Sequence, residues 1–573
     1  MPSIRHLIIK NFRSIRHLEW WPRSGLNCLI GPGDSGKSTI LDAIDLVLGA
    51  RRSIAFNDGD FCCGDFARPI EIFATIGDLE AELQNFEFYG NVLRGFNGQT
   101  SELFDEPRQG FETVLTLRLR VGSDLEADWT LFSERAEAMG IECRLKWKHR
   151  TLVSPNRLGV ISHHHLTWGS GSVLPRLSDD AMDANETLAS ASRAARAAFP
   201  ASLPAGVQQV VTKVQTVATG MAVNVQGVKA SLDAKSVALS NGAISLHDCD
   251  NTPLRQLGTG STRLLVSGLQ KVASDSSIFL VDEAEYGLEP FRISKFLHQL
   301  GAKDTVPGKQ VFITTHSPYV LRELQASQLH VIRKGTTVPF PPPHSEHSHK
   351  VFRLNGSDIE QATLRSCAEA FFAQKVIVAE GKTEVGIVRG ADLFSETQGM
   401  PTILEKGVYC ADGGGDNMFQ RASVFRSLLY PTAIFKDSDI AEQHYGFTQQ
   451  ATTNGISIYE WGNGWATEHA LFCTCPANVI PALLNLACIR KSEDAVNAHI
   501  LKASNNAYSL EICRTRFIDE MRIPLANAAK RKSWFKDIEP AEWIARNIIC
   551  PNYPSFLPGL RTVVDSLFQW AKL

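Results

Sequence analysis

The hydrophobic pattern of the first 49 residues predicts a strand, a loop and a helix in succession. IRHLIIKNFRSI alternates between apolar and polar residues, as in a strand that buries one face, with Ile4, Leu7 and Ile9 among its apolar positions. GLNCLIGPGDSGKSTILDAIDLVLG continues with an apolar run, a glycine-rich loop and an amphipathic helix that we expect to end at Gly49. The N-terminal segment is therefore predicted to open an α/β sheet.

The following segments extend this sheet and are then interrupted. PIEIFATI, TVLTLRLRV and IECRLKWKHR alternate in the same way and predict antiparallel strands added to it. From about Pro175 to Lys235 the sequence is rich in Ala, Ser and Val, which predicts a helical insertion over residues 171–236. We expect this insertion to separate two halves of one domain, residues 1–170 and 237–337, and to pack closely against a second protomer because its side chains are small.

The second half of that domain and a further domain complete the chain. The Asn241-Gly242 pair predicts a hairpin turn, and SSIFLVDEAEYGLEP and QVFITTHSPYVL each contain an apolar strand. VPFPPPHSEHSHK is rich in Pro, His and Ser and predicts a surface connector within a linker and connecting helix over residues 338–371. Residues 372–573 begin with another apolar strand and form the expected second domain, with helical elements at its C-terminal end.

Composition adds few constraints. A chain of 573 residues with 44% hydrophobic and 21% charged residues is long enough for two or three cores. Because the formal net charge is only −3, local patches or bound metal would have to hold any nucleic acid. The 12 cysteines are scattered, so we expect reduced thiols in a cytoplasmic protein. No uncharged apolar run is long enough to span a membrane.

The glycine-rich loop predicts a phosphate-binding site. GPGDSGKS fits the pattern G-x-x-x-x-G-K-[ST] in the strand, loop and helix context that the pattern requires. Backbone N–H groups of such a loop hold phosphates, while Lys37 would reach the β- and γ-phosphate oxygens and Ser38 would bind Mg²⁺. ATP and Mg²⁺ are therefore the expected cofactors. We expect the phosphate contacts at Gly31, Gly33, Ser35, Gly36, Lys37, Ser38 and Thr39.

Two later strands end in residues suited to the same nucleotide. Asp282 and Glu283 follow the apolar run of residues 278–281, which is typical of a strand that delivers a magnesium-orienting aspartate and a water-activating glutamate. His316 follows the next apolar strand, where its imidazole would touch the γ-phosphate. A helix N-cap is the simpler interpretation of Asp282 and Glu283, but the phosphate loop favours the nucleotide site.

These elements, in this order, resemble an ABC-type ATPase of the structural-maintenance-of-chromosomes branch, with LGTGSTR at the signature position. The resemblance implies that nucleotide lies between two heads and that each head offers Gly260 and Ser261 to the other's phosphates. It therefore implies a homodimer or homotetramer. The usual serine after the leucine is Gly258 here, so Ser261 or Thr259 would have to supply the hydroxyl.

A second, acidic site is predicted in the C-terminal domain. The apolar strand of KVIVAEGKTEVGIV is followed by Glu380 and Glu384, and that of TAIFKDSDIAE ends at Asp437 and Asp439. Aspartates at i and i+2 point to the same side of a strand end, so both can face the glutamates. Glu468 in WATEHALF is the candidate fifth carboxylate. Hard oxygen ligands suit Mg²⁺ or Mn²⁺, although each half alone would also fit a helix cap or a polar turn.

Strand-Glu-Gly-x-x-Glu followed by strand-Asp-x-Asp resembles a Toprim domain, and an ABC head with a helical insertion and a Toprim domain resembles the overcoming-lysogenization-defect (OLD) family of nucleases. The resemblance implies two-metal cleavage of DNA, with the five carboxylates as metal ligands and a lysine that steadies the transition state. We assign this lysine to Lys532, with Lys530 and Lys536 close by, and Asp412 is a weaker candidate. The family also implies antiphage defence, with a helicase or another defence protein as a partner in some cases.

Rival functions give different expectations. Toprim domains also serve topoisomerases and primases, but the sequence has neither a recognisable strand-passage domain nor a cysteine-rich zinc module. The non-enzymatic alternative is a DNA-clamping ATPase whose Toprim domain is only an interaction scaffold. Finally, RLKWKHR would project Arg144, Lys146, Lys148 and Arg150 from one face of a strand, which would contact DNA phosphates or form a solvated sheet edge.

Overall fold

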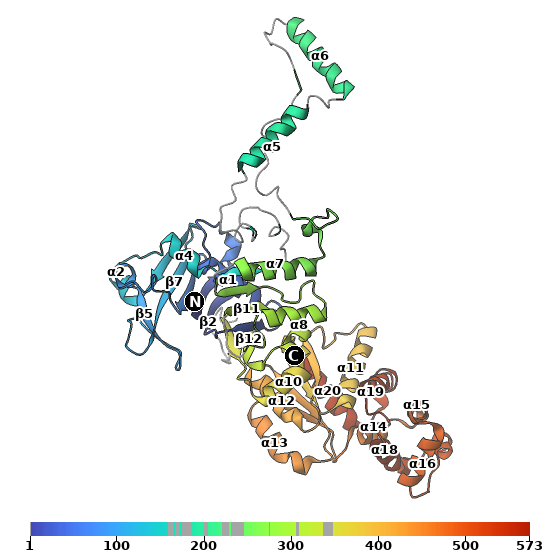
Figure 1. Ribbon diagram of the computed structural model, residues 1–573. Coiled ribbons are helices and arrows are strands. Elements are labelled where there is room, and N and C mark those ends of the chain that lie inside the picture. Colours follow the sequence, from blue (N-terminus) through green and yellow to red (C-terminus); the bar gives the residue numbers. More distant parts are fainter. Residues whose placement is uncertain are drawn as a thin grey trace.

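The chain folds into two bodies and a helical arm. The computed structural model describes residues 2–158, 166, 172, 174, 185–199, 204–220, 229–230, 246–273, 276–304, 309–335 and 348–572. Helices α5 (Asn185–Ala198) and α6 (Ala205–Gly220) extend away from the N-terminal body (Figure 1) and lie within the segment expected to be a helical insertion. The expected turn at Asn241-Gly242, connector residues 338–347 and parts of 171–236 lie outside the described residues.

The N-terminal body is built on a 13-stranded sheet in the order β6-β5-β7-β4-β1-β2-β13-β12-β3-β11-β10-β9, with β8 paired to β7. From β12 through β3, β11 and β10 to β9 the neighbouring strands are parallel, whereas β1, β2 and β4 to β8 form an antiparallel half. The strands are β1 (Ser3–Phe12), β2 (Ile15–Trp20), β3 (Leu26–Ile30), β4 (Ile70–Gly77), β5 (Leu93–Asn97), β6 (Glu102–Phe104), β7 (Glu112–Val121), β8 (Ala127–Phe132), β9 (Asn156–Leu158), β10 (Ile278–Val281), β11 (Gln310–Thr314), β12 (Leu329–Lys334) and β13 (Ser348–Arg353).

Helix α1 (Lys37–Leu48) packs against the antiparallel half of this sheet. Its buried side chains, among them Ile40, Leu41 and Ile44, belong to one core with the antiparallel strands. The helix ends at Gly49, as the sequence predicts, and the N–H of Gly49 donates to Asp45 O at 3.0 Å. The other helices of this body are α2 (Phe86–Tyr89), α3 (Glu134–Ala138), α4 (Trp147–Val153), α7 (Thr259–Ala273), α8 (Pro290–Gln299) and α9 (Pro318–Glu323).

The C-terminal body contains a smaller parallel sheet. Its order is β15-β14-β16-β17, and its strands are β14 (Lys375–Ala379), β15 (Val408–Asp412), β16 (Thr432–Lys436) and β17 (Ser457–Glu460). All carboxyl ends of parallel strands meet at one edge of a sheet, where α/β proteins hold ligands. The residues that follow β14 and β16 are Glu380 and Asp437, so this topology brings both predicted acidic segments to the same edge.

Helices cover this sheet and form most of the remaining C-terminal body. Residues before and between the strands form α10 (Asp358–Ser366), η10 (Ala368–Phe372), α11 (Lys382–Thr397), α12 (Asn417–Ser427) and α13 (Ala441–Thr453). The later helices are α14 (Thr467–Thr474), α15 (Ile480–Lys491), α16 (Glu493–Ala503), α17 (Leu510–Thr515), α18 (Arg522–Arg531), α19 (Ile538–Ile544) and α20 (Pro558–Lys572). Among the described residues, no single helix has the length and hydropathy to cross a bilayer, and one pair, Thr467–Thr474 with Ala477–Lys491, meets these criteria only when its two members, bent by 116°, are taken together.

Helices α11 and α19 approach each other through two glycines. A Cβ atom on Gly390 would lie 2.3 Å from Glu542 O and 2.7 Å from Ala545 Cβ, and one on Gly386 would lie 2.5 Å from Ile538 O. Such distances are too short for any side chain larger than hydrogen. Because α11 carries Glu384 in its first turn, this close packing fixes the position of a predicted metal ligand.

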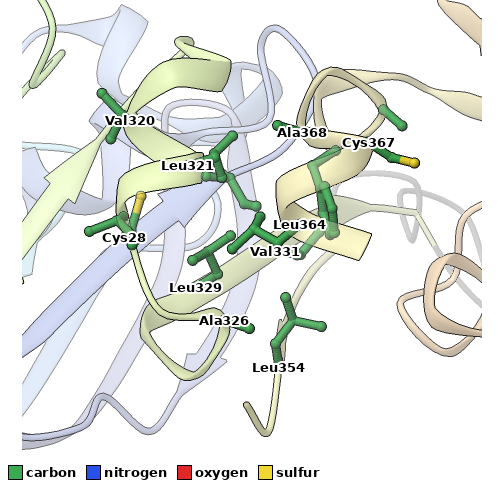
Figure 2. Packing of buried hydrophobic residues seen from close by; sticks show 14 of the residues in the cluster. Cys28, Val320, Leu321, Ala326, Leu329, Val331, Leu354, Leu364, Cys367 and Ala368 are labelled. Atoms are coloured by element: carbon green, nitrogen blue, oxygen red, sulfur yellow. The ribbon is translucent and has the colours of Figure 1, made fainter. Parts of the chain in front are cut away.

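One hydrophobic core runs through both bodies. It includes Leu321 and Val331 of the N-terminal body, Leu364 and Ala368 of the connecting segment, and Val376 of the C-terminal sheet. Figure 2 shows the side chains of Leu321, Val331, Leu364 and Ala368 packed together between the elements that carry them. The two bodies are therefore joined by buried packing as well as by the chain.

Two expectations from the sequence are wrong in their local structure. IECRLKWKHR contributes only a single bridge, between Cys143 and Leu131, and then the helix α4, so its basic residues do not share one face of a strand. The expected linker supplies β13, which pairs with β12 and β2, so the N-terminal sheet continues to Arg353.

Candidate functional site

The phosphate loop has the backbone geometry that a nucleotide requires. Gly31 and Gly36 have φ values of 151° and 85°, and a Cβ atom on Gly31 would lie 2.6 Å from Ile332 O. Positive φ and close approach to a neighbouring strand both require glycine. Gly33 is exposed and Thr39 is half-buried in the first turn of α1.

Lys37 lies folded against this loop. Its ammonium group donates to Gly31 O at 3.1 Å, to Pro32 O at 3.0 Å and to Ser35 Oγ at 3.3 Å. Burial lowers the pKa of Lys37. A phosphate would exchange these neutral acceptors for charged ones, which form stronger hydrogen bonds.

The strand ends β10 and β11 complete the predicted nucleotide site. Asp282 Oδ1 accepts from Ser38 Oγ at 3.1 Å and from Thr314 Oγ1 at 2.6 Å. The N–H of Glu283 donates to Thr314 Oγ1 at 2.8 Å. Glu283 has a φ of 48°, a strained conformation for a residue with a side chain, and such strain is concentrated at functional sites. The structure thus brings Ser38, Asp282 and Glu283 together from distant parts of the sequence.

His316 lies beside this site and also contacts the connecting segment. The backbone N–H of His316 donates to Glu285 Oε1 at 2.7 Å. Burial, reinforced by the positive charge of Lys37, lowers the pKa of the imidazole. The imidazole also stacks on the ring of Phe372, with centroids 6.3 Å apart and planes inclined by 23°. His316 is thus in contact with the residue that ends η10, just before β14.

The signature segment is tied to its own chain. Ser261 Oγ accepts from Arg292 Nη1 at 3.0 Å, and Arg263, which is buried, donates to the backbone oxygen of Asp282. A Cβ atom on Gly260 would lie 2.2 Å from Gly287 O. The start of α7 is therefore packed against the loop that follows Asp282.

The acidic residues of the C-terminal body converge at the carboxyl edge of the small sheet. Glu380 Oε2 accepts from the N–H of Asp437 at 2.9 Å. Thr467 Oγ1 lies 2.6 Å from Glu384 Oε1 and 2.9 Å from Asp437 Oδ1, and the N–H of Thr467 donates to Asp437 Oδ1 at 3.0 Å. Glu468, the next residue, is buried. Two carboxylates thus meet at the hydroxyl group of Thr467, and Glu380 and Glu468 lie close to Asp437.

Burial and mutual repulsion shape the charge of this cluster. Burial raises the pKa of Glu384 and of Asp437, and the neighbouring carboxylates raise both further. Burial also raises the pKa of Glu380 and of Glu468. Groups that are hard to ionise in this way are concentrated at functional sites, and a bound cation would offset their mutual repulsion.

Lys530 is the lysine that meets the cluster. Its ammonium group forms an ion pair with Asp439, and Lys530 and Lys536 both oppose the rise in the pKa of Glu468. Lys532 follows the end of α18 and lies near His499, whose pKa it helps to lower. The sequence favoured Lys532, whereas in the structure Lys530 is the lysine that contacts a carboxylate of the cluster.

Several residues of both sites have no recognisable sequence pattern. Thr467 precedes Glu468 and is itself held by Trp461, whose Nε1 donates to Thr467 Oγ1 at 2.7 Å. Thr314 is a strand residue in the nucleotide site. Asp412 Oδ1 accepts from the N–H of Gly414 at 2.9 Å, which is the role of a turn residue.

The donor set fits a hard divalent cation. It consists of carboxylate oxygens alone, which suits Mg²⁺ or Mn²⁺. In the part of the chain that the structure describes, no three acidic, histidine or cysteine side chains already lie at metal-ligand spacing. A cation would therefore have to draw the carboxylates away from their present partners, including Thr467 and Lys530.

Comparison with known families agrees with this two-site arrangement. Residues 26–322 match the family described as "AAA domain, putative AbiEii toxin, Type IV TA system", and residues 371–439 match "Overcoming lysogenization defect protein-like, TOPRIM domain". The chain belongs to the OLD-like proteins. The predicted fold class, an α/β ATPase head followed by a Toprim domain, is confirmed for this OLD-like protein.

Individual relatives are more distant. The OLD-like chain is 49% identical over 53 residues to the DNA replication and repair protein RecF of Nitrosococcus oceani, a match that covers 9% of this chain and only 14% of that protein. Similar solved structures include the Smc head domain with an extended coiled coil bound to the C-terminal domain of ScpA, derived from Pyrococcus furiosus. It has 15% identity, a TM-score of 0.31 and coverage of 62% of this chain and 96% of that one. The SMC head domain from Thermotoga maritima has 13% identity, a TM-score of 0.28 and coverage of 62% and 99%.

Proposed function

We propose that this OLD-like protein is a metal-dependent DNA endonuclease whose cutting is controlled by ATP. The observation that carries the proposal is the cluster of buried and half-buried carboxylates beside Thr467 at the carboxyl edge of the small sheet. A structural role alone would not favour such a cluster, because each carboxylate raises the cost of ionising the next. The residues that would hold the cations are Glu380, Glu384, Asp437, Asp439 and Glu468.

The chain's own residues position the reaction. Thr467, itself held by Trp461, fixes the orientation of Glu384 and Asp437, and the Asp437 N–H orients Glu380. Lys530 would leave Asp439 and neutralise charge on the phosphate that is cut. When bound, the divalent cations supply an activated water and stabilise the leaving oxygen.

The ATPase head would bind and hydrolyse ATP. Lys37 would turn from the loop carbonyls to the β- and γ-phosphates, and Ser38 and Asp282 would hold Mg²⁺. Glu283 would orient the attacking water, and His316 would meet the γ-phosphate. As in the sequence resemblance, Gly260 and Ser261 would act on the nucleotide of a second protomer in a homodimer or homotetramer.

Contacts between the two bodies support control of cutting by ATP. His316, beside the nucleotide site, stacks on Phe372, and the strand that follows Phe372 ends at Glu380. Arg333 of β12 makes a second contact between the two bodies. It donates to Gln374 O at 3.1 Å, and its guanidinium lies 4.2 Å from the centroid of the Tyr430 ring. A nucleotide that moves His316 would therefore shift the start of β14. This shift would control cutting if the two positions of β14 differ in cutting activity.

The proposed biological setting is antiphage defence or DNA processing. The family match to an OLD-like Toprim domain supports this setting at the level of the family. A helicase or another defence protein is a candidate partner.

Incubation with supercoiled plasmid in Mg²⁺ or Mn²⁺ tests the proposal. Wild-type protein should produce nicked or linear DNA, and Asp437→Asn should not. Asp494→Asn is the matched control, because Asp494 is exposed in the first turn of α16, an element that supplies none of the proposed metal ligands. Relaxed, covalently closed circles would indicate a topoisomerase, and plasmid left unchanged by the wild type would favour the clamp with a Toprim scaffold.

A further inference from the structure

A pocket lined by positively charged side chains lies on the antiparallel half of the ATPase sheet. A cavity of about 300 Å³ is lined by five arginines from three separate segments: Arg51, Arg52, Arg118, Arg144 and Arg150. Two tryptophans, Trp129 and Trp147, line it as well, and Asp128 is its only acidic lining residue. The basic segment that was expected to be a strand thus contributes to a pocket together with residues far away in the sequence.

Three of these arginines are neutralised by nearby carboxylates. Arg51 pairs with Asp45 at 2.6 Å, Arg118 with Glu137 at 2.7 Å, and Arg144 with Asp128 at 2.8 Å. The remaining two, Arg52 and Arg150, have no carboxylate within ion-pair distance among the described residues. These two guanidinium groups carry the unbalanced charge of the pocket.

Helix capping explains only part of this arrangement. Arg150 Nε donates to Gly49 O at 3.0 Å and Trp129 Nε1 donates to Leu46 O at 3.0 Å, so both satisfy carbonyl groups at the end of α1. Arg150 Nη2, however, is buried and has no hydrogen-bond partner among the described residues. Leaving a buried charged donor unsatisfied is costly, and Arg52 contributes nothing to the cap.

The aromatic rings define what kind of anion would fit. The guanidinium of Arg150 lies 4.5 Å from the centroid of the Trp129 ring, and that of Arg52 lies 5.4 Å from the centroid of the Trp147 ring. Trp147 is 47% exposed, so its indole is available at the mouth of the pocket. Stacking surfaces combined with cations are what single-stranded nucleic acids bind, because every base has a ring face and every nucleotide has a phosphate.

We infer that this pocket binds one nucleotide of a single DNA strand, with its base on Trp147 and its phosphate between Arg52 and Arg150. A strand fits better than a free nucleotide because positive charge continues outside the pocket at Lys146, which is exposed beside α4, whereas Lys148 is paired with Glu82 at 3.0 Å. This inference rests on the proposed action on DNA. Helix α1 would then lie between two ligands, with the DNA strand at its C-terminal end and the ATP phosphates at its N-terminal end. These ends are about 18 Å apart at a rise of about 1.5 Å per residue.

The test is binding of a fluorescent oligo(dT) of about 20 nucleotides, long enough for one strand-binding surface. Anisotropy is measured in EDTA, so that no cutting occurs, over a range of salt concentrations. Trp147→Leu should weaken binding about tenfold, as expected for the loss of one stacked base. Arg52→Gln should lower the slope of log affinity against log salt by about 0.7, which corresponds to one phosphate contact on a single strand. Both residues are exposed, so the folded state should survive, and unchanged melting temperatures check this.

Trp543→Leu and Arg546→Gln are the matched controls, because they remove an exposed tryptophan and an exposed arginine from the C-terminal body. If the wild type, the pocket variants and the controls all bind the oligonucleotide equally, the inference is overturned and the proposed function is not. Failure of the wild type to bind oligo(dT) in EDTA likewise overturns the inference, whereas the proposed function is tested separately by cutting of supercoiled plasmid in Mg²⁺ or Mn²⁺. Displacement by dTMP at the same nucleotide concentration as oligo(dT) would assign the pocket to free nucleotides and also overturn the inference.

Discussion

Replacement of Phe372 by leucine should uncouple cutting from ATP. The change removes the aromatic ring that stacks on His316 but keeps an apolar side chain at a half-buried position. Neither metal ligands nor phosphate contacts are altered. We therefore expect cutting without ATP and ATP hydrolysis to stay close to the wild-type rates, while the effect of ATP on cutting becomes smaller.

The size of the effect follows from the geometry of the pair. Aromatic pairs contribute about 0.5–1.5 kcal/mol beyond their buried area when their centroids are about 4.5–7 Å apart. The rings of His316 and Phe372 are 6.3 Å apart, near the outer end of that range, so the lower half of the energies applies. Because about 1.4 kcal/mol corresponds to a factor of ten, the ratio of cutting rates with and without ATP should move about two- to fivefold toward unity.

Single-turnover nicking of supercoiled plasmid, with and without ATP, measures this ratio. Phe371→Leu is the control from the neighbouring position, since Phe371 is fully buried and packs on Phe425 at 4.9 Å inside the C-terminal body. The control should lower the melting temperature and leave the ratio unchanged. An unaltered ratio in Phe372→Leu, or an equal loss in both variants, would refute the proposed route through His316.

Three further predictions concern the two sites. Lys37→Ala should weaken ATP binding at least about tenfold and remove the response of cutting to ATP, while cutting itself persists. Glu283→Gln should keep ATP binding but stop ATP hydrolysis. Equal ATP turnover in Glu283→Gln and wild type would contradict the assignment of Glu283. Asp437→Asn should slow nicking at least about 100-fold with ATP hydrolysis retained, and Mn²⁺ should raise the melting temperature of the wild type but not of this variant. Lys530→Gln should slow nicking about 100-fold and Lys532→Gln by less than about twofold, and the reverse order in a nicking assay would restore the original assignment.

The sequence was sufficient wherever function depends on local order. The phosphate loop, the end of α1 at Gly49 and the acidic residues after β14 and β16 could be predicted, because a glycine loop or a strand end positions the residues next to it. The parallel sheet then brings Glu380 and Asp437 together without further information.

Side chains whose roles depend on distant packing could not be predicted. Thr467 becomes central only because the helix that it begins is placed against two other elements, and nothing in its own neighbourhood distinguishes it. Lys530 and Lys532 are the same residue type two positions apart, and only the end of α18 distinguishes them, because Lys530 lies in its last turn and Lys532 follows it. RLKWKHR alternates like a strand, but its residues from Trp147 onward belong to the helix α4, so tertiary context overrode the local pattern.

The buried core shared by the two bodies limits how the protein can be divided. The Toprim family match begins at residue 371, whereas Leu364, Cys367 and Ala368, all buried in the shared core, precede it. A fragment cut at the boundary of that match would lose these side chains and leave their apolar partners in water, where they would favour aggregation. Evolution faces the same restriction: a Toprim domain could not be exchanged between such proteins as a module unless its connecting helix and the surface beneath it moved as well.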